Sequence, residues 1–348
     1  MRGLPCPPSG RSCTSRVMAK WACAFALVTI TFNLILSSPM NPNFVPPVID
    51  EKYVLTTHLK SGGYGSVYSG YNADTHTPVV GKLEAQDGHS VLSHEYQMML
   101  KIQDKVEGVP RVYAHKELSD VIHGKYQVLI MEKLGPNLRS VVRGKPSPSA
   151  PLPEAVKVKN LLIFAVQALT RLEQLHGEGI LHNDIKPENF LLGLQENNNT
   201  VYLIDYGISS MFKNRDLHVH YSDGHSRKGT PGYQSLHNML GEAQSRRDDV
   251  ESLGYCLLSL YPGYILPWAQ HFQGEAEAGR GDAVQATMLE TTISDLCTDA
   301  PTEFSAYFRH IKALGFYEKP NYTYLKKQFA ALYERKYREN IDDARFTY

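Results

Sequence analysis

The hydrophobic pattern divides the chain into a first part with the two-residue period of strands and a second part with helical spacing. In the first part, runs rich in β-branched and aromatic residues predict strands at 53–59, 66–71, 77–83 and 126–131. One helical segment, residues 91–103, lies between the third and fourth of these strands. In the second part, Val158 to Leu175 repeats apolar residues at helical spacing, which predicts a long helix that ends near Gly177. We therefore expect an α+β protein: a small antiparallel sheet with one helix, followed by a larger, mostly helical unit.

Length and charge fit two compact units with a mildly acidic body. The chain has 348 residues, and basic and acidic residues both number 36. Residues 1–49 contain four basic residues and no acidic one, so the remainder has 32 against 36, a net charge of −4. This balance argues against nucleic acid as a main partner. Only Cys256 and Cys297 lie beyond residue 49, so no disulfide framework is expected and a reducing compartment is favoured.

Residues 1–49 form a leader whose role the sequence leaves open. A basic segment precedes the apolar run from Trp21 to Leu36, which is shorter than the roughly 20 residues of a membrane span. The run fits a signal-peptide core or an acid-free transit segment. The favoured interpretation is that translation starts at Met40 and that the protein works in the cytoplasm, the nucleus or both. Tethering to a membrane or targeting to an organelle through residues 1–38 is the alternative.

The stretch 181–192 holds the most specific chemistry in the sequence. Asp184 is followed by Lys186 two residues later and by Asn189 five residues later, and an apolar strand comes next. This spacing is that of a protein kinase catalytic loop. Phosphoryl transfer needs a carboxylate to accept the hydroxyl proton, a cation at the γ-phosphate and a carboxamide oxygen on Mg²⁺. Asp184, Lys186 and Asn189 suit these three roles in that order.

Upstream residues fit the phosphates of a nucleotide. Gly62, Gly63 and Gly65 lie between two strands, where the missing Cβ lets backbone N–H groups approach an anion. Lys82 lies near the end of the next strand and could hold the α- and β-phosphates. Glu95 on the helical segment could pair with Lys82 and fix its ammonium. Each feature alone is also compatible with an ordinary turn or surface residue.

Two further segments complete a nucleotide site. Strand residues 201–204 run into Asp205-Tyr206-Gly207, which resembles Asp-Phe-Gly, so Asp205 is expected as a second Mg²⁺ ligand. Gly135-Pro136 ends the strand at 126–131 and suits a hinge whose backbone binds adenine. The expected cofactors are ATP and Mg²⁺.

Longer segments carry a more specific resemblance. They are Glu-Lys-Leu-Gly-Pro at 132–136, Asn-Phe-Leu-Leu-Gly at 189–193, Gly-Thr-Pro-Gly-Tyr at 229–233, and the segments 244–255, 266–268 and 316–325. In order and content they resemble the casein kinase 1 family, from about Tyr53 to Tyr337.

The resemblance implies a two-lobed protein kinase fold. Its N-lobe would be residues 50–134, its C-lobe 135–337, and 338–348 a short tail. The protein would be a monomeric, ATP-dependent serine/threonine protein kinase whose partners are protein substrates with Ser or Thr. The implied nucleotide-binding residues are Gly62, Gly63, Gly65, Val67, Val80, Lys82, Met131, Glu132 and Leu134.

The resemblance also implies roles around the catalytic loop. Thr230 would orient Asp184 and Lys186. Asp249, on a buried helix, would hold the backbone of the loop. His182 and Tyr206 would stack in the core behind the site.

Four positions depart from the family pattern. Lys60 replaces a glycine and Val80 an alanine of the adenine pocket, and steric pressure from the two favours the rival hypothesis of a pseudokinase scaffold. Asn183 replaces the arginine before the catalytic aspartate, so we expect activity without phosphorylation of the activation segment. Gly232 replaces an arginine that helps to bind substrates already phosphorylated upstream, although Arg227 and Lys228 are near in sequence.

Overall fold

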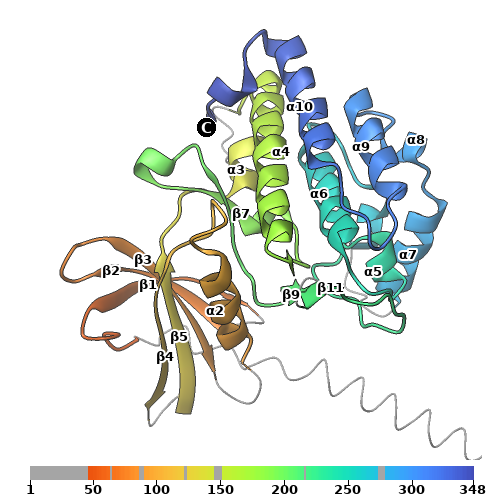
Figure 1. Ribbon diagram of the computed structural model, residues 1–348. Helices are drawn as coiled ribbons and strands as arrows, with labels where there is room; N and C mark the ends of the chain where they lie inside the picture. Colours follow the sequence, from red (N-terminus) through yellow and green to blue (C-terminus); the bar gives the residue numbers. More distant parts are fainter. Residues whose placement is uncertain are drawn as a thin grey trace, which may run out of the picture.

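The computed structural model describes residues 46–62, 65–85, 90–120, 124–144, 151–214, 217–272 and 279–348 (Figure 1). Most of the leader and Gly63, one of the glycines expected at the nucleotide, lie outside these residues. Within the described ranges, no helix is both long and apolar enough to cross a membrane.

The N-lobe is an antiparallel sheet of five strands in the order β1-β2-β3-β5-β4. The strands are β1 (Tyr53–Gly62), β2 (Gly65–Asn72), β3 (Pro78–Ala85), β4 (Val112–Asp120) and β5 (Gly124–Glu132), and the helix is α2 (Val91–Ile102). Alternation along β3 has two consequences. Val79 and Leu83 enter the core of the sheet and are fully buried. Lys82 and Glu84 share the opposite face, which lies against α2.

The C-lobe is built on the long helix α4 (Glu154–Gly177). It contacts α6 (Arg246–Leu260) and α10 (Tyr322–Tyr337), and α9 (Thr302–Lys312) packs on both of these. The remaining helices are α3 (Leu138–Arg143), α5 (Leu236–Met239), α7 (Arg280–Glu290) and α8 (Ile293–Leu296). Helix α4 keeps the predicted end at Gly177, and its apolar face from Val158 to Leu175 is buried as expected.

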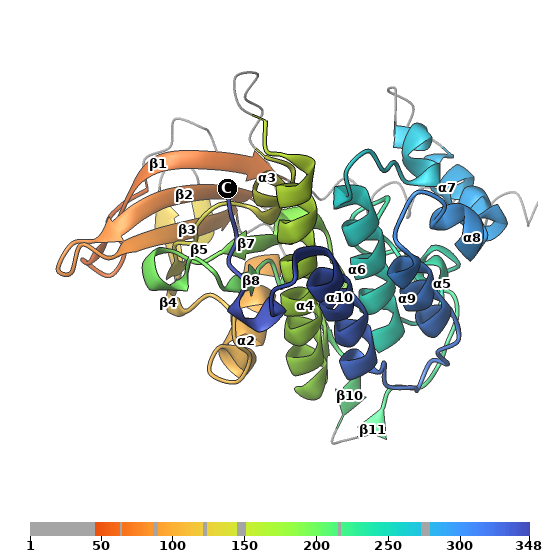
Figure 2. The same ribbon diagram turned by 90° about the horizontal axis from the view of Figure 1, so that it is seen from above.

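Within the described residues, the C-lobe also contains three short antiparallel strand pairs. They are β6 (Ile180–Leu181) with β9 (Ser210–Met211), β7 (Phe190–Leu192) with β8 (Val201–Leu203), and β10 (Lys213–Asn214) with β11 (Leu217–His218). Figure 2 shows the sheet on one side, the helices on the other, and β7 and β8 where they meet. The expected two-lobed α+β kinase fold is confirmed.

The C-terminal residues pack back onto α4. The carboxamide of Asn160 donates to the carbonyl of Thr347 at 2.6 Å and accepts from its N–H at 3.0 Å. Asn199, in the β7–β8 loop, accepts from the N–H of Phe346 at 2.9 Å. Two asparagines thus bind the tail through its backbone.

Candidate functional site

The backbone of residues 182–183 is held by a buried acid from another helix. The N–H groups of His182 and Asn183 donate to the carboxylate of Asp249, on α6, at 2.7 and 2.9 Å. His176 Nε2 lies 2.9 Å from the same carboxylate. Burial alone would raise the pKa of Asp249, but its contacts with His176 and the loop keep that pKa below its usual value. The charged acid fixes Asn183 in a left-handed conformation, with φ of 66°.

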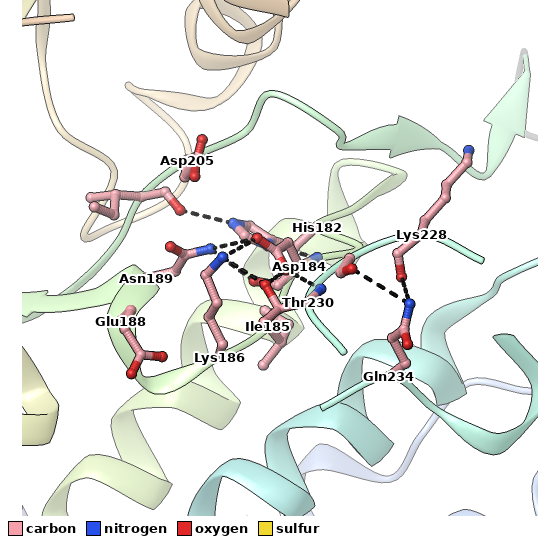
Figure 3. A network of polar contacts seen from close by, with 12 residues as sticks. His182, Asp184, Ile185, Lys186, Glu188, Asn189, Asp205, Lys228, Thr230 and Gln234 are labelled. Carbon is pink, nitrogen blue, oxygen red and sulfur yellow. Dashed lines mark hydrogen bonds and ion pairs between the residues drawn. The ribbon is translucent and has the colours of Figure 1, made fainter. Parts of the chain in front are cut away.

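Asp184 is the centre of a short network of polar contacts (Figure 3). Its Oδ1 accepts from the backbone N–H and the hydroxyl of Thr230 at 2.8 and 2.7 Å. Its Oδ2 accepts from Lys186 Nζ at 2.6 Å, and Lys186 also donates to the Thr230 hydroxyl at 2.7 Å. The structure therefore brings Asp184, Lys186 and Thr230 together, although Thr230 lies 46 residues after Asp184.

Asn189 and Asp205 supply oxygen donors beside this network. The Asn189 amide donates to the backbone carbonyl of Asp184 at 2.8 Å, which fixes the orientation of the carboxamide and leaves Oδ1 as an acceptor. Asp205 has a φ of 72°, and its Oδ1 accepts from Lys82. A carboxamide oxygen and a carboxylate oxygen suit a hard divalent cation such as Mg²⁺.

Lys82 bridges the two lobes. Its Nζ donates to Glu95 on α2 at 2.6 Å and to Asp205 at 2.8 Å. Burial alone would lower the pKa of Lys82, but the two carboxylates raise it above its usual value, so the ammonium stays charged. Asp205 behaves in the opposite way: burial would raise its pKa, and Lys82 lowers it.

A cavity of about 310 Å³ lies between the lobes next to Lys82. Its lining includes these residues expected at the nucleotide: Gly62, Gly65, Val67, Val80, Met131, Glu132 and Leu134. Lys60 and Val80, two of the departures from the family pattern, also line it. Three apolar lining residues were not predicted, Pro110, Leu191 and Ile204. Alternation could have indicated Leu191, because it points to the opposite face of β7 from the buried Phe190 and Leu192.

Gly65 needs to be glycine for a reason other than an approaching anion. Its φ is 107°, and a Cβ there would lie 1.9 Å from the carbonyl oxygen of Leu83. Close packing of β2 on β3 therefore excludes a side chain at this position. At Gly62 a Cβ would meet nothing within 4 Å.

The activation segment, residues 205–229, is fastened to the C-lobe without an arginine at position 183. The Asn183 amide donates to the carbonyl of Ile208 at 2.8 Å and to the Ser210 hydroxyl at 2.9 Å. Further along, an aromatic cluster joins the segment to the α9–α10 loop; its members are Phe212, His218, Tyr221, Phe316 and Tyr317. Tyr317 also accepts a hydrogen bond from the N–H of Tyr221 at 3.1 Å.

His182 and Tyr206 lie in the core behind the loop as expected, but their rings do not stack. Both are fully buried, and their ring centroids are 5.1 Å apart at an interplanar angle of 67°. The contact is edge-to-face, a favourable arrangement for aromatic rings.

Gly232 and its neighbours explain the missing arginine in part. Gly232 has a φ of 95°, and a Cβ there would lie 3.1 Å from Phe272, so a larger residue would be strained. Arg227 is already engaged with Asp282 at 2.9 Å and with the carbonyl of Met239 at 3.0 Å. The Lys228 side chain extends away from Asp184 (Figure 3).

A comparison with known families agrees with this geometry. The family model described as protein kinase domain matches residues 53–313. The match covers more than half of the 348-residue chain and contains both the cavity and the catalytic-loop network. The chain therefore belongs to the protein kinase family.

Proposed function

We propose that this protein kinase is a serine/threonine kinase of the casein kinase 1 type, which transfers the γ-phosphate of Mg-ATP to protein hydroxyls. The observation that carries the proposal is the double anchoring of Asp184. Thr230 fixes one carboxylate oxygen and Lys186 the other. Lysine two residues after the base is typical of kinases that act on serine and threonine.

Asp184 acts as the general base in this proposal. An incoming serine or threonine hydroxyl loses its proton to the carboxylate as it attacks phosphorus. Thr230 orients the carboxylate through two hydrogen bonds. Lys186 is close enough to the base to stabilise negative charge on the transferred phosphoryl group.

The carboxamide oxygen of Asn189 and the carboxylate of Asp205 are the groups that would hold Mg²⁺. The ion, when bound, neutralises charge that develops between the β- and γ-phosphates. Asn189 is prepared for this role because its N–H₂ group is already bound to the carbonyl of Asp184. Lys82 would move from Asp205 towards the α- and β-phosphates while Glu95 continues to hold it.

The cavity suits the adenine end of the nucleotide. Val80, Leu191 and Ile204 provide apolar surface, and Glu132 and Leu134, on either side of Lys133, also line it. Met131 directly precedes Glu132 at the end of β5, also lines the cavity, and would limit the depth of the pocket.

The contacts of the activation segment support activity without phosphorylation. Asn183 binds the segment through neutral hydrogen bonds, and the aromatic cluster packs it against the lobe. A phosphate on this segment would lack the guanidinium that binds it in many regulated kinases.

The decisive experiment is transfer of radiolabelled phosphate from ATP to casein, with and without Mg²⁺, followed by identification of the phosphorylated amino acid. Asp184→Asn should abolish transfer and leave nucleotide affinity nearly unchanged, because the base acts mainly in the transition state. Asp205→Asn should weaken Mg-nucleotide binding as well. Glu188→Gln makes the same acid-to-amide change at an exposed position of the loop and should leave transfer intact. Wild-type turnover in Asp184→Asn would contradict the proposal, as would phosphotyrosine as the only product.

Two residues of the cavity lining support a second candidate function, that of a pseudokinase, which binds nucleotide and partners without efficient catalysis. Lys60 and Val80 are larger than the residues they replace, and both face the cavity. Nucleotide binding without transfer in the same assay, together with recovered transfer in Lys60→Gly Val80→Ala, would favour this function.

The same proposal includes lobe boundaries at residues 134 and 337, a monomeric state, and a location in the cytoplasm or nucleus. Every residue in the proposed mechanism follows Tyr53. The fragment Met40–Tyr348 should therefore be fully active, and its sedimentation should be that of one chain. An inactive fragment beside an active full-length chain would show that the leader packs on the kinase.

A further inference from the structure

Helix α2 carries Glu95, the partner of Lys82, so the position of this helix decides whether that ion pair forms. Its first turn contains no acidic residue of its own. The first N–H groups of a helix have no partners inside it and carry partial positive charge. The sheet supplies an acid to this end of α2.

Glu84, two residues after Lys82 on the same face of β3, is that acid. One of its carboxylate oxygens accepts from the N–H of Leu92 at 2.8 Å, and the other from the N–H of Val91 at 3.2 Å. The carboxylate also accepts from the hydroxyl of Ser90, the N-cap of α2, at 2.6 Å. Glu84 is only 5% exposed. A buried acid normally needs such compensation, and here the helix end provides it.

Gln127 on β5 extends the same anchor. Its Oε1 accepts from the hydroxyl of Ser93 at 2.7 Å and lies 2.9 Å from the Ser90 hydroxyl, whose one proton it shares with Glu84, and His115 Nε2 on β4 lies 3.0 Å from it. The exposed Glu117, at the outer end of the network, accepts weakly from the Gln127 amide at 3.4 Å. Two strands, β3 and β5, thus bind the first turn of the helix through the buried side chains of Glu84 and Gln127, and β4 contacts Gln127.

Strand β3 therefore holds α2 at two points. Glu84 binds the N-terminus, and Lys82 binds Glu95 about one turn further along. Glu84 and Lys82 lie two residues apart on one face of β3. Their two contacts therefore fix the first turn of α2 and Glu95 relative to this strand. If the N-terminus were released, Glu95 would keep its ion pair with Lys82 and a backbone hydrogen bond from Tyr206, but the first turn of α2 would lose its anchor on the sheet.

We infer that Glu84 is a positioning residue for phosphoryl transfer: it locks helix α2 in the place where Glu95 meets Lys82. This inference rests on the proposed kinase activity. It means that a contact inside the N-lobe holds α2 in the position where Glu95 pairs with Lys82. The helix then needs no activating partner to bring Glu95 to the cleft.

Glu84→Gln tests this role, and Glu117→Gln, the same change at an exposed position of β4, is the matched control. A glutamine at position 84 places an N–H₂ group against helix N–H donors, so the first turn of α2 should lose protection in hydrogen exchange. We expect kcat/KM for Mg-ATP to fall about tenfold in Glu84→Gln, and by less than about twofold in Glu117→Gln. Ser90→Ala, which removes the N-cap hydroxyl, should move both readouts in the same direction and serves if Glu84→Gln does not fold.

A double-mutant cycle separates positioning from general destabilisation. If Glu84 acts through Glu95, then Glu84→Gln should cost less than about twofold more in a Glu95→Gln background, because the pair it supports is already lost. An undiminished tenfold loss in that background would overturn the inference. So would hydrogen exchange in residues 91–93 that matches the wild type. A wild-type protein without transfer activity would instead refute the proposed function, and the exchange experiment would still decide the role of Glu84.

Discussion

Replacing Asp249 by asparagine should both destabilise the protein and misplace the catalytic loop. The carboxylate is 2% exposed and accepts three hydrogen bonds, from the backbone of His182 and Asn183 and from His176. Asparagine has a single acceptor oxygen, and its N–H₂ group would face at least one of the three donors.

The magnitude follows from these contacts. A buried donor left without a partner costs about 1–3 kcal/mol, and two bonds that lose their charge become weaker by about 1 kcal/mol each. The free energy of unfolding should therefore fall by about 3–5 kcal/mol. In a protein of 348 residues such a loss lowers Tm by roughly 4–7 °C. Asn183 would also lose the support for its left-handed backbone, so Asp184 should shift relative to Thr230.

Thermal unfolding and the transfer assay, run on Asp249→Asn and on the control Asp282→Asn, check both parts. The Asp282 side chain is 81% exposed and pairs with Arg227, so its replacement should change stability by less than about 1 kcal/mol. For Asp249→Asn we expect kcat to fall at least about a hundredfold at a temperature well below its Tm. A wild-type Tm would refute the energetic argument. A lowered Tm with unchanged kcat would show that Asp249 stabilises the lobe without positioning the loop.

Three other predictions concern pH, activation and substrate choice. Burial raises the pKa of Asp248 to about 6, so the folded state binds the proton of this carboxyl more tightly than the unfolded state does. The stabilisation that this group provides is complete below about pH 4 and is lost as pH rises to about 6. The free energy of unfolding should fall by about 3 kcal/mol over this range. Asp248→Asn should remove this fall in stability. The reasoning would be contradicted if the free energies of unfolding of variant and wild type, measured by denaturation from pH 4 to pH 7, changed with pH in the same way. Phosphatase treatment, with mass spectrometry to confirm bare residues between 205 and 229, should leave the rate within about threefold, whereas a hundredfold loss restored by phosphorylation would mean that a phosphate orders the segment. Gly232 replaces an arginine, so the preference for a peptide with an upstream phosphoserine over the same peptide without it should be about tenfold weaker than in a kinase that has the arginine. A strong preference for the phosphorylated peptide would mean that another cation binds the phosphate.

The sequence predicted those parts of the fold in which local pattern and tertiary environment agree. The strands around Lys82 and the helix before Gly177 have clear periods because one face of each is buried. Strand β4 was not predicted, since its residues from His115 to Ser119 include charged and polar side chains on both faces. Helix α3 was not predicted either, because six residues are too few for a periodic signal.

The candidate site shows the same division. Asp184, Lys186 and Asn189 are fixed in one short loop, so their spacing alone indicates their proximity. Glu84 was not predicted because an acid in a strand looks like an exposed residue until the helix packed above it is known. Gln127 is similar, since nothing local distinguishes a buried amide from a solvated one. Such residues depend on where two distant segments meet.

The way the activation segment is fastened bears on its response to ionic strength. Dissolved salt screens attraction between charges, and a loop ordered by a phosphate–arginine pair loosens as salt is added. Here an asparagine amide, a serine hydroxyl and packed rings hold the segment. Neutral contacts of this kind are hardly screened. The part of the segment that these contacts hold should remain equally ordered in dilute buffer and in concentrated salt, whereas the exposed ion pair of Arg227 with Asp282, near the end of the segment, should weaken as salt is added.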